Sequence, residues 1–321
     1  MNWIRGTAWA LLVVGTGLVG CGESVTAAGS GPFVRVLGTV QDGGLPHASC
    51  HCDRCERARS DPQERRFVAS LALVLPSTGR VFLIDATPDL HSQLDQLRDL
   101  RKAPSGRVDR APVDGVFLTH AHIGHYLGLA FFGYEAIHTR ALPVIATPRM
   151  AAYLRANGPW SQLVTLGNIE LEEMAPGDSR DLGEGVTVTA FSAPHRDEYA
   201  DTLGFVIHGP NRKLLYLPDT DSWTAWTTPL PETLRNIDVA LLDGTFFSPQ
   251  ELPGRSVDSI GHPLIRQTLE LLKEPVQQGG LEVYFTHLNH SNPALDPDSD
   301  ERHEIETRGF HVLSEGQEIA L

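Results

Sequence analysis

The chain has 321 residues and a formal net charge of −14 at pH 7, with 41% hydrophobic and 21% charged residues. These proportions are ordinary for a globular protein, and a chain of this length can bury the core of one sizeable α/β domain. The negative charge argues against a nucleic-acid backbone as the main partner, because no basic stripe offsets it.

The N-terminal segment differs in composition from the rest. An apolar run over residues 7–19 is too short to span a bilayer comfortably, and it ends in Leu18–Cys21, which resembles a bacterial lipobox. The sequence therefore predicts a lipoprotein signal peptide over residues 1–20, a lipid on Cys21, and a small polar tether over residues 21–32. A short membrane anchor and an ordinary secretory signal are the alternatives. On this interpretation the protein is an exported bacterial lipoprotein, anchored to a membrane on its periplasmic or cell-surface side.

Three thiols follow the tether in a Cys-x-Cys-x-x-Cys pattern, as Cys50, Cys52 and Cys55. Three thiols cannot all pair with one another as disulfides, so an exported protein needs another use for them. A tetrahedral structural zinc with three thiolates and one imidazole would satisfy the set. We therefore predict a zinc insert near residues 47–55, with a redox or disulfide role as the alternative.

The fourth ligand of this zinc is not adjacent in the sequence. We favour His290, because it lies three residues after His287, which is itself a candidate ligand of a second metal site. His47 and His51 are the alternatives.

Two apolar runs then predict strands. Val81–Ile84 ends at Asp85, which we interpret as a residue that orients a ligand histidine through its second ring nitrogen; a turn residue that ends the strand is the alternative. Val116–Leu118 leads directly into a run of ligand-type residues, Thr119–His125.

That run holds three imidazoles within six residues, at His120, His122 and His125. Neutral imidazole is the commonest metal ligand in proteins, so the cluster predicts a metal site, and chance clustering of surface histidines is the alternative. Three further ligand-type residues each follow a short apolar run that predicts a strand: His195 after Val186–Phe191, Asp219 after Lys213–Leu217, and His287 after Leu281–Phe285. Ligands placed just past strand ends converge on one edge of a sheet.

This order of ligands resembles the metallo-β-lactamase superfamily, and the resemblance extends from Phe33 to Leu321. It implies an α/β fold, the αββα sandwich of two mixed β-sheets flanked by helices, with two metal ions in the usual site. Residues 33–321 would form a single domain of this kind.

The cysteine cluster narrows the resemblance to the PqqB-like branch, linked to pyrroloquinoline quinone (PQQ) biosynthesis, and to the PhnP-like phosphodiesterases. In PhnP-like proteins the fourth zinc ligand matches His290. Three stretches look PqqB-like: Gln41–Pro46, Ala86–Leu90 and Leu242–Phe247.

The resemblance also implies a division of the ligands. One zinc position would use His120, His122 and His195, with Asp219 as a bridging and catalytic carboxylate. The second would keep His125, His287 and Asp219 only, because the superfamily's aspartate before the third histidine is Gly124 here. Two imidazoles and one carboxylate suit Fe(II), and Mn is an alternative. We expect one firmly held and one weaker metal, and we expect Gly124→Asp to raise the metal content if the second position is half-built.

His262 precedes a predicted helix over Leu264–Leu272. It resembles a loop histidine that PhnP-like enzymes direct at the leaving group, so it is a candidate general acid, and helix capping or loop packing is the alternative. Asp243 is either a hydrogen-bonding partner in the site or a strand cap.

Three functions are compatible with these features. The first is a metallo-hydrolase whose metal-bound hydroxide attacks an ester, a cyclic phosphodiester or an amide. The second is a PqqB-type iron-dependent oxidation or hydroxylation linked to PQQ biosynthesis. The third is a non-catalytic, tethered lipoprotein that binds a metal or a ligand. The expected partners are a small-molecule substrate and a membrane, and the sequence leaves the oligomeric state open.

Overall fold

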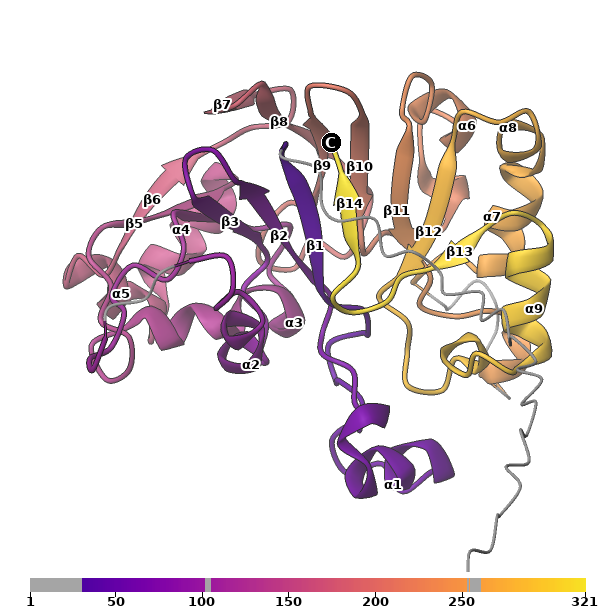
Figure 1. Ribbon diagram of the computed structural model, residues 1–321, viewed down its shortest axis with the longest axis horizontal. Helices are drawn as coiled ribbons and strands as arrows, with labels where there is room; N and C mark the ends of the chain where they lie inside the picture. The colour runs from indigo at the N-terminus through magenta and orange to yellow at the C-terminus, as the bar shows by residue number, and fades with distance from the viewer. Residues whose placement is uncertain (1–30, 102–104, 253, 255–260) are drawn as a thin grey trace, which may run out of the picture.

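Two β-sheets form the centre of the computed structural model, which describes residues 31–101, 105–252, 254 and 261–321. The sheets pack against each other, helices cover their outer faces, and a small lobe containing α1 (Asp53–Ser60) projects from one end of the sandwich (Figure 1). The predicted αββα sandwich of two mixed sheets is confirmed.

The first sheet has the strand order β14-β1-β2-β3-β4-β5-β6. Its pairs from β14 to β3 are antiparallel and those from β3 to β6 are parallel. The strands are β1 (Phe33–Gly38), β2 (Ser70–Leu75), β3 (Arg80–Ile84), β4 (Gly115–Phe117), β5 (Leu142–Ala146), β6 (Ile169–Glu173) and β14 (Glu318–Ala320).

The second sheet has the order β13-β12-β11-β10-β9-β8-β7. Here the pairs from β7 to β10 are antiparallel, and those from β10 to β13 are parallel. The strands are β7 (Ser179–Gly183), β8 (Val186–Ser192), β9 (Leu203–His208), β10 (Lys213–Leu217), β11 (Val239–Asp243), β12 (Glu282–Thr286) and β13 (His311–Val312). Each sheet thus contributes a run of parallel strands whose carboxyl ends lie at one edge.

The strand sequences explain the layers. All six residues of β2 are buried, since alternate side chains of an inner strand face the other sheet and the outer helices. Leu71 and Leu73 join the core between the sheets, whereas Ala72 and Val74 join the core beneath the helices. In β8 the valines and alanine are buried while the intervening threonines are half-buried, which is the pattern of a strand near the edge.

The helices are short, and several begin with clear capping signals. Thr147 accepts a hydrogen bond from the backbone N–H of Met150 at the start of α4, and Ser299 caps α9 in the same way. Besides α1, the α-helices are α2 (Leu90–Asp95), α3 (Ile123–Tyr126), α4 (Pro148–Ala156), α5 (Trp160–Thr165), α6 (Leu230–Thr233), α7 (Ile265–Leu271), α8 (Lys273–Gln277) and α9 (Asp300–Thr307). Short 3-10 helices are η1 (Pro62–Glu64), η2 (Leu127–Phe132), η3 (Trp223–Ala225), η4 (Pro249–Glu251) and η6 (Pro293–Leu295).

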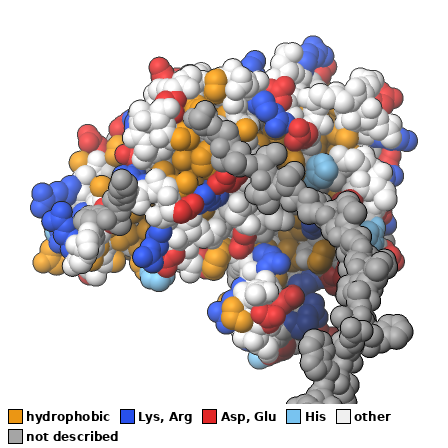
Figure 2. Space-filling view, in the orientation of Figure 1, with side chains coloured by type: hydrophobic (Ala, Val, Ile, Leu, Met, Phe, Trp, Pro, Cys, Tyr) orange, Lys and Arg blue, Asp and Glu red, His pale blue; other side chains and the backbone are white. Residues whose placement is uncertain are grey.

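The strands predicted before Asp85, His120, His195, Asp219 and His287 are confirmed as β3, β4, β8, β10 and β12, and the predicted helix after His262 is α7. The predicted signal peptide, Cys21 and most of the tether lie outside the described residues. Within the described ranges, no helix is long and apolar enough to cross a membrane. On the face shown in Figure 2, acidic and basic side chains are interspersed, and the projecting lobe carries both.

Candidate metal centre

The predicted ligands come together where the parallel strands end. His120 and His122 follow β4, Asp219 follows β10, and His287 follows β12, while His195 follows the antiparallel β8. All except His122 are buried. A buried cluster of imidazoles and carboxylates needs a compensating cation or a dense network of hydrogen bonds.

The first group comprises His120, His122, His195 and Asp219, and one ligand atom from each lies within 4.8 Å of the others. His122 Nδ1 lies 2.9 Å from His120 Nε2 and 3.2 Å from His195 Nε2. Two ligand atoms that are each about 2.1 Å from a tetrahedral zinc lie about 3.4 Å apart. The spacing of these nitrogens therefore fits a shared ion.

Asp219 Oδ2 occupies the middle of the whole histidine cluster. It lies 3.1 Å from His195 Nε2, 3.3 Å from His120 Nε2 and 3.8 Å from His122 Nδ1. It also lies 3.9 Å from His125 Nε2 and 3.8 Å from His287 Nε2. One carboxylate oxygen thus faces nitrogens of both predicted metal positions, as a bridging ligand would.

The second group differs from the expectation. His125 and His287 lie together as predicted, but their carboxylate neighbour besides Asp219 is Asp42. Its Oδ1 atom lies 3.4 Å from His125 Nε2 and 3.6 Å from His287 Nε2. The second position therefore has two carboxylates within reach, where the sequence predicted one.

Gly124 explains how Asp42 reaches the site. A Cβ atom added at Gly124 would lie 2.1 Å from Asp42 Oδ1, which is far inside van der Waals contact. This contact argues against the expectation that Gly124→Asp raises the metal content, because Asp42 already occupies the space that an added carboxylate would need. The signal for Asp42 was present in Gln41–Pro46, but that run supported only a family resemblance.

The second ring nitrogen of His120, His125 and His287 has a close protein partner, whereas His195 Nδ1 is buried without a hydrogen-bond partner. Asp85 Oδ2 lies 2.7 Å from His125 Nδ1, as the interpretation of Asp85 required. Thr119 Oγ1 donates to Asp85 and lies 3.0 Å from His120 Nδ1. On the other sheet, Thr245 Oγ1 donates to Asp243 at 2.7 Å and lies 2.9 Å from His287 Nδ1. Such partners fix the tautomer and the ring orientation of a ligand histidine.

The sequence did not predict two acidic residues that lie next to ligand histidines. His122 Nε2 lies 3.2 Å from Glu198 Oε2, and His195 Nδ1 lies 3.4 Å from Asp221 Oδ1. Both acids lie within three residues of a predicted ligand, at Glu198 after His195 and at Asp221 after Asp219. Proximity in sequence was the available signal, but acidic residues near a ligand are common.

The backbone is strained at the same edge. Asp85 and His287 have φ angles of 70° and 60°, in the left-handed region that residues other than glycine seldom occupy. Both residues come directly after a strand, and each aims a side chain into the cluster. Strain of this kind is typical of sites where geometry is set by function.

His262 is in direct contact with the carboxylates of the cluster. Its Nδ1 atom lies 2.9 Å from Asp243 Oδ2 and 3.1 Å from Asp219 Oδ1. Burial alone would lower the pKa of His262, but Asp243 and Asp219 hold that pKa well above its usual value. Asp243 likewise contacts both His262 and Thr245, so it serves the site and does more than end β11.

The electrostatic field of the cluster favours a cation. Burial lowers the pKa of His120 well below its usual value, and the neighbouring His125 adds to this effect. Burial would raise the pKa of Asp219, yet His262 and His287 hold it well below the ordinary value. Asp42 Oδ1, Asp219 Oδ1, His125 Nε2 and His287 Nε2 are buried and have no hydrogen-bond partner. A bound metal would satisfy such orphaned atoms.

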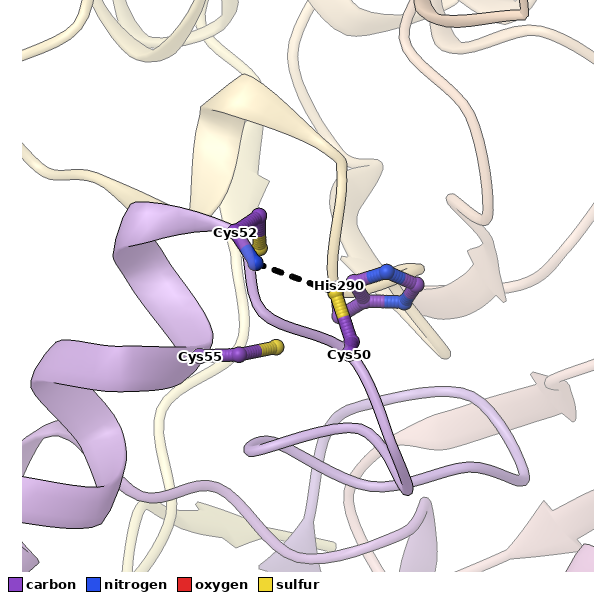
Figure 3. A group of neighbouring side chains, drawn as sticks. All are labelled: Cys50, Cys52, Cys55 and His290. Atoms are coloured by element: carbon purple, nitrogen blue, oxygen red, sulfur yellow. Dashed lines mark hydrogen bonds between the residues drawn. The ribbon is translucent and has the colours of Figure 1, made fainter.

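The cysteine cluster is a separate site. Cys50, Cys52, Cys55 and His290 place one ligand atom each within 4.8 Å of the others, and their side chains point toward a common centre (Figure 3). His290 Nδ1 is buried without a hydrogen-bond partner, and the described cysteines form no disulfide. This set of three sulfurs and one imidazole fits tetrahedral zinc.

The alternative histidines, His47 and His51, are not part of this group of ligand atoms. His51 is exposed and contacts Glu56 at 2.9 Å, while His47 contacts the carbonyl oxygen of Ala48 at 2.9 Å. The His47 ring packs on that of His290, with centroids 4.3 Å apart.

Two chain segments connect the small lobe, which contains the cysteine site, to the metal centre. The N–H of Gln41 donates to the carbonyl oxygen of Leu288, and Arg54 donates to the carbonyl oxygen of His290 at 2.9 Å. Asp42 and His287 thus stand on the two segments that connect the cysteine lobe to the sheets.

A family model agrees with this arrangement. The model described as "Beta-lactamase superfamily domain" matches residues 80–288. Coenzyme PQQ synthesis protein B of Cupriavidus necator is 27% identical over 314 residues, which cover 90% of this chain and 99% of that protein. The protein of the same name from Rhodopseudomonas palustris is also 27% identical, over 317 residues and the same shares.

Solved structures give the same fold. Zn(2+)-bound PqqB from Methylobacterium extorquens superposes with a TM-score of 0.74 at 24% identity, covering 90% of this chain and all of that one. A diphosphatase from the PhnP family gives a TM-score of 0.63 at 21% identity, covering 90% of this chain and 97% of that one. At these identities the likeness concerns the fold.

Proposed function

Because the chain belongs to the metallo-β-lactamase superfamily, in its PqqB-like branch, we propose that it is a metal-dependent hydrolase of a small molecule. The single observation that supports this most is the position of Asp219 Oδ2. It faces the three histidine nitrogens of the first position and the two of the second. Zinc held by three histidines lowers the pKa of a coordinated water to about 7 and stabilises a developing oxyanion.

The protein's own residues would hold this centre and move protons around it. Asp85 and Thr119 keep His125 and His120 in one tautomer, so their Nε2 lone pairs face the metal positions. The Nδ1 atom of His262 is hydrogen-bonded to Asp243 and lies 3.1 Å from Asp219 Oδ1, which leaves Nε2 to hold a proton for a leaving group. Asp219 therefore acts on both the ligand histidines and the proposed acid.

The solvent side of the first position indicates the kind of substrate. Ile123, the residue after His122, is 57% exposed, and Leu127 and Phe131 of η2 are further exposed apolar residues. Arg196 Nη2 approaches His122 Nε2 at 3.4 Å. A small ester, lactone or cyclic phosphodiester with an apolar portion and a developing negative charge would match this mixed rim.

Turnover of a chromogenic substrate tests the hydrolase proposal. Purified chain loaded with Zn²⁺ should hydrolyse at least one member of a panel containing bis(p-nitrophenyl) phosphate, p-nitrophenyl esters and a lactone. His122→Ala should lose roughly 100-fold or more, because the first position loses a ligand. His303→Ala is the matched control, since His303 is exposed on α9. Full metal loading without any turnover would favour a binding protein instead.

The role of His262 is tested by the leaving group. His262→Gln should slow hydrolysis of an alkyl ester by roughly 100-fold, within the range of general acid catalysis, and should affect a p-nitrophenyl ester much less. An equal loss on both substrates would assign His262 to positioning of Asp219 rather than to proton transfer.

A second candidate function is an oxidation linked to PQQ biosynthesis. The specific support is the match with proteins named Coenzyme PQQ synthesis protein B over 99% of their length. Oxygen uptake supported by Fe(II), lost in His125→Ala but retained in His120→Ala, would favour it. Hydrolysis supported by Zn²⁺ with the opposite pattern of losses would count against it.

We also propose that Cys21 carries a lipid that tethers the protein to a membrane. The support is the lipobox-like run before it. Palmitate labelling of the chain expressed in a Gram-negative host should be lost in Cys21→Ser, with release of the protein from the membrane fraction. Equal membrane association of both forms would contradict this proposal.

A further inference from the structure

We infer that Asp42, from the loop after β1, supplies to the second metal position the carboxylate that Gly124 cannot supply. This inference rests on the proposed metal centre and names one of its ligands. It also assigns a role to Gly124, which leaves the space that Asp42 occupies. The two residues lie 82 positions apart, so the arrangement follows from the fold rather than from a local motif.

The distances indicate a shared ion rather than direct hydrogen bonds. Asp42 Oδ1 lies 3.4 Å from His125 Nε2 and 3.6 Å from His287 Nε2. Both separations exceed the usual 2.7–3.2 Å range of an N–H···O bond. They agree with the separation of about 3.4 Å expected for two ligands of one tetrahedral zinc.

The partners of the two Nδ1 atoms support the same conclusion. His125 Nδ1 is 2.7 Å from Asp85, and His287 Nδ1 is 2.9 Å from Thr245, whose hydroxyl hydrogen goes to Asp243. In the tautomers that these contacts favour, both Nε2 atoms present lone pairs. These lone pairs face carboxylate oxygens of Asp42 and Asp219, and a cation between them removes the repulsion.

Gly124 is required for room, not for backbone conformation. It is not among the residues with positive φ, so its backbone suits other residues. A Cβ atom there would lie 2.1 Å from Oδ1, 2.7 Å from Cγ and 2.9 Å from Cα of Asp42. Any side chain at position 124 would therefore push Asp42 away from the histidines.

The loop that carries Asp42 is held in place by neighbours. Val40 forms bridges with Val68 and Leu288, and the N–H of Gln41 donates to the carbonyl oxygen of Leu288 at 3.0 Å. The side chain of Gln41 also accepts a hydrogen bond from Asn289. Asp42 is thus fixed next to the residues that follow His287, as a metal ligand must be.

The donor set then changes the expected metal. The second position groups Asp42 with two imidazoles, and Asp219 Oδ2 lies 3.9 Å and 3.8 Å from those imidazoles, whereas the first position groups three imidazoles with Asp219. Carboxylates favour harder ions than imidazoles do, so Mn²⁺ should compete better at the second position than at the first. The position also has fewer free coordination sites than a two-histidine, one-carboxylate triad.

The test exchanges the two residues and counts metal. Purified chain and variants are stripped with chelator, titrated with Zn²⁺ or Mn²⁺ alone, and measured by elemental analysis and calorimetry. Asp42→Asn should bind one metal fewer per chain, or bind the weaker metal roughly 10–100-fold less tightly, as for other losses at metal sites. Gly124→Asp should also weaken that metal, because two carboxylates compete for one space. The double variant Asp42→Gly/Gly124→Asp should recover it.

Two controls separate this inference from the proposed function. Asp89→Asn removes a nearby carboxylate that accepts from the N–H of Val68, and it should leave the metal count unchanged. His122→Ala should lose the tighter metal instead. Retention of both active-site metals in Asp42→Asn would overturn the inference while leaving the hydrolase proposal intact. Failure of the folded double variant to recover the weaker metal would overturn it too. Absence of any metal beyond the cysteine site in the unmodified chain would overturn both.

Discussion

His120, His125 and His287 each use one ring nitrogen for the proposed metals and the other for a fixed protein partner. The same arrangement of a carboxylate, a threonine and a histidine occurs on both sheets. On the first, Thr119 links Asp85 to His120; on the second, Thr245 links Asp243 to His287. In each case a buried carboxylate accepts the threonine hydroxyl proton, so the hydroxyl oxygen is free to accept from the imidazole. The protein thereby fixes ring orientation before any metal binds.

These threonines should separate the two metal positions. Thr245→Val removes the acceptor of His287 and should weaken the second metal roughly 10–100-fold. Thr119→Val removes the partner of His120 and should weaken the first metal by a similar factor. Competition with a fluorescent zinc chelator measures both affinities. Thr165→Val, which alters only a hydroxyl bonded within α5 to Ser161, is the matched control. Equal effects of both threonine variants on both metals would show that the positions are not independent.

At this scale the sequence predicted the histidines but not all of the acids. His120, His122, His195 and Asp219 each follow a strand, so their meeting at a sheet edge could be expected. Asp42 follows β1 by four residues and lies in a loop, where the sequence does not indicate which way a side chain points. Its role depends on an absent side chain at Gly124, and a missing group leaves no pattern to read.

At the scale of elements, the cysteine lobe and the metal centre share their supports. The loop from β1 to α1 carries Asp42, Cys50 and Cys52, and α1 itself carries Cys55, while the loop after β12 carries His287 and then His290. A structural zinc in the lobe would therefore hold together the two segments that supply ligands to the second position. The first position draws its histidines from loops after β4 and β8, which do not join the lobe.

Disrupting the lobe should therefore affect the two active-site metals unequally. Cys52→Ser should remove one zinc per chain and weaken the second-position metal, by roughly 10-fold if the loss resembles that of an outer partner. The first-position metal should keep its affinity. Elemental analysis and zinc titration of the folded variant measure these effects. His51→Gln, between the cysteines but bonded to Glu56, is the control. Loss of the first-position metal alone would contradict the assignment.

The strands and the lobe show why some elements could be predicted and others could not. Continuous apolar runs such as Lys213–Leu217 and Val81–Ile84 lie in doubly covered inner strands, which their composition indicates. The edge strand β7 has the sequence SRDLG, with one buried residue. It is held by pairing with β8 rather than by its own propensity, so its composition does not indicate a strand.

At the scale of the whole molecule, the last strand pairs with the first strand of the described residues. β14 pairs with β1, and Glu315 accepts a hydrogen bond from the backbone N–H of Phe67 at 2.5 Å. Burial raises the pKa of Glu315 from 4.5 to about 7, although the N–H of Phe67 and the charge of Arg66 oppose the shift. The folded chain therefore binds a proton at Glu315 more tightly than the unfolded chain does.

This shift gives a pH-dependent contribution to stability. The contribution is fully present below the unfolded pKa of 4.5 and is lost as the pH rises to about 7. Glu315→Gln keeps a neutral acceptor for Phe67, so it should raise the free energy of unfolding at pH 8 by about 1–2 kcal/mol and change it little near pH 4.5. Urea denaturation at both pH values measures this. A difference that is the same at both values, or that also occurs for the exposed Glu170→Gln, would refute the explanation.

The exclusion between a side chain at position 124 and a carboxylate at position 42 also restricts how such a protein could have arisen. An ancestor with aspartate at 124 that gained Asp42 first would hold two carboxylates in one space, which should weaken the second metal. If it lost the aspartate first, it passed through a form with an incomplete second position. Descent from such an ancestor by single substitutions therefore runs through an intermediate with a weakened second position. Among related sequences, acidic residues at 42 and glycine at 124 should accordingly be inherited together.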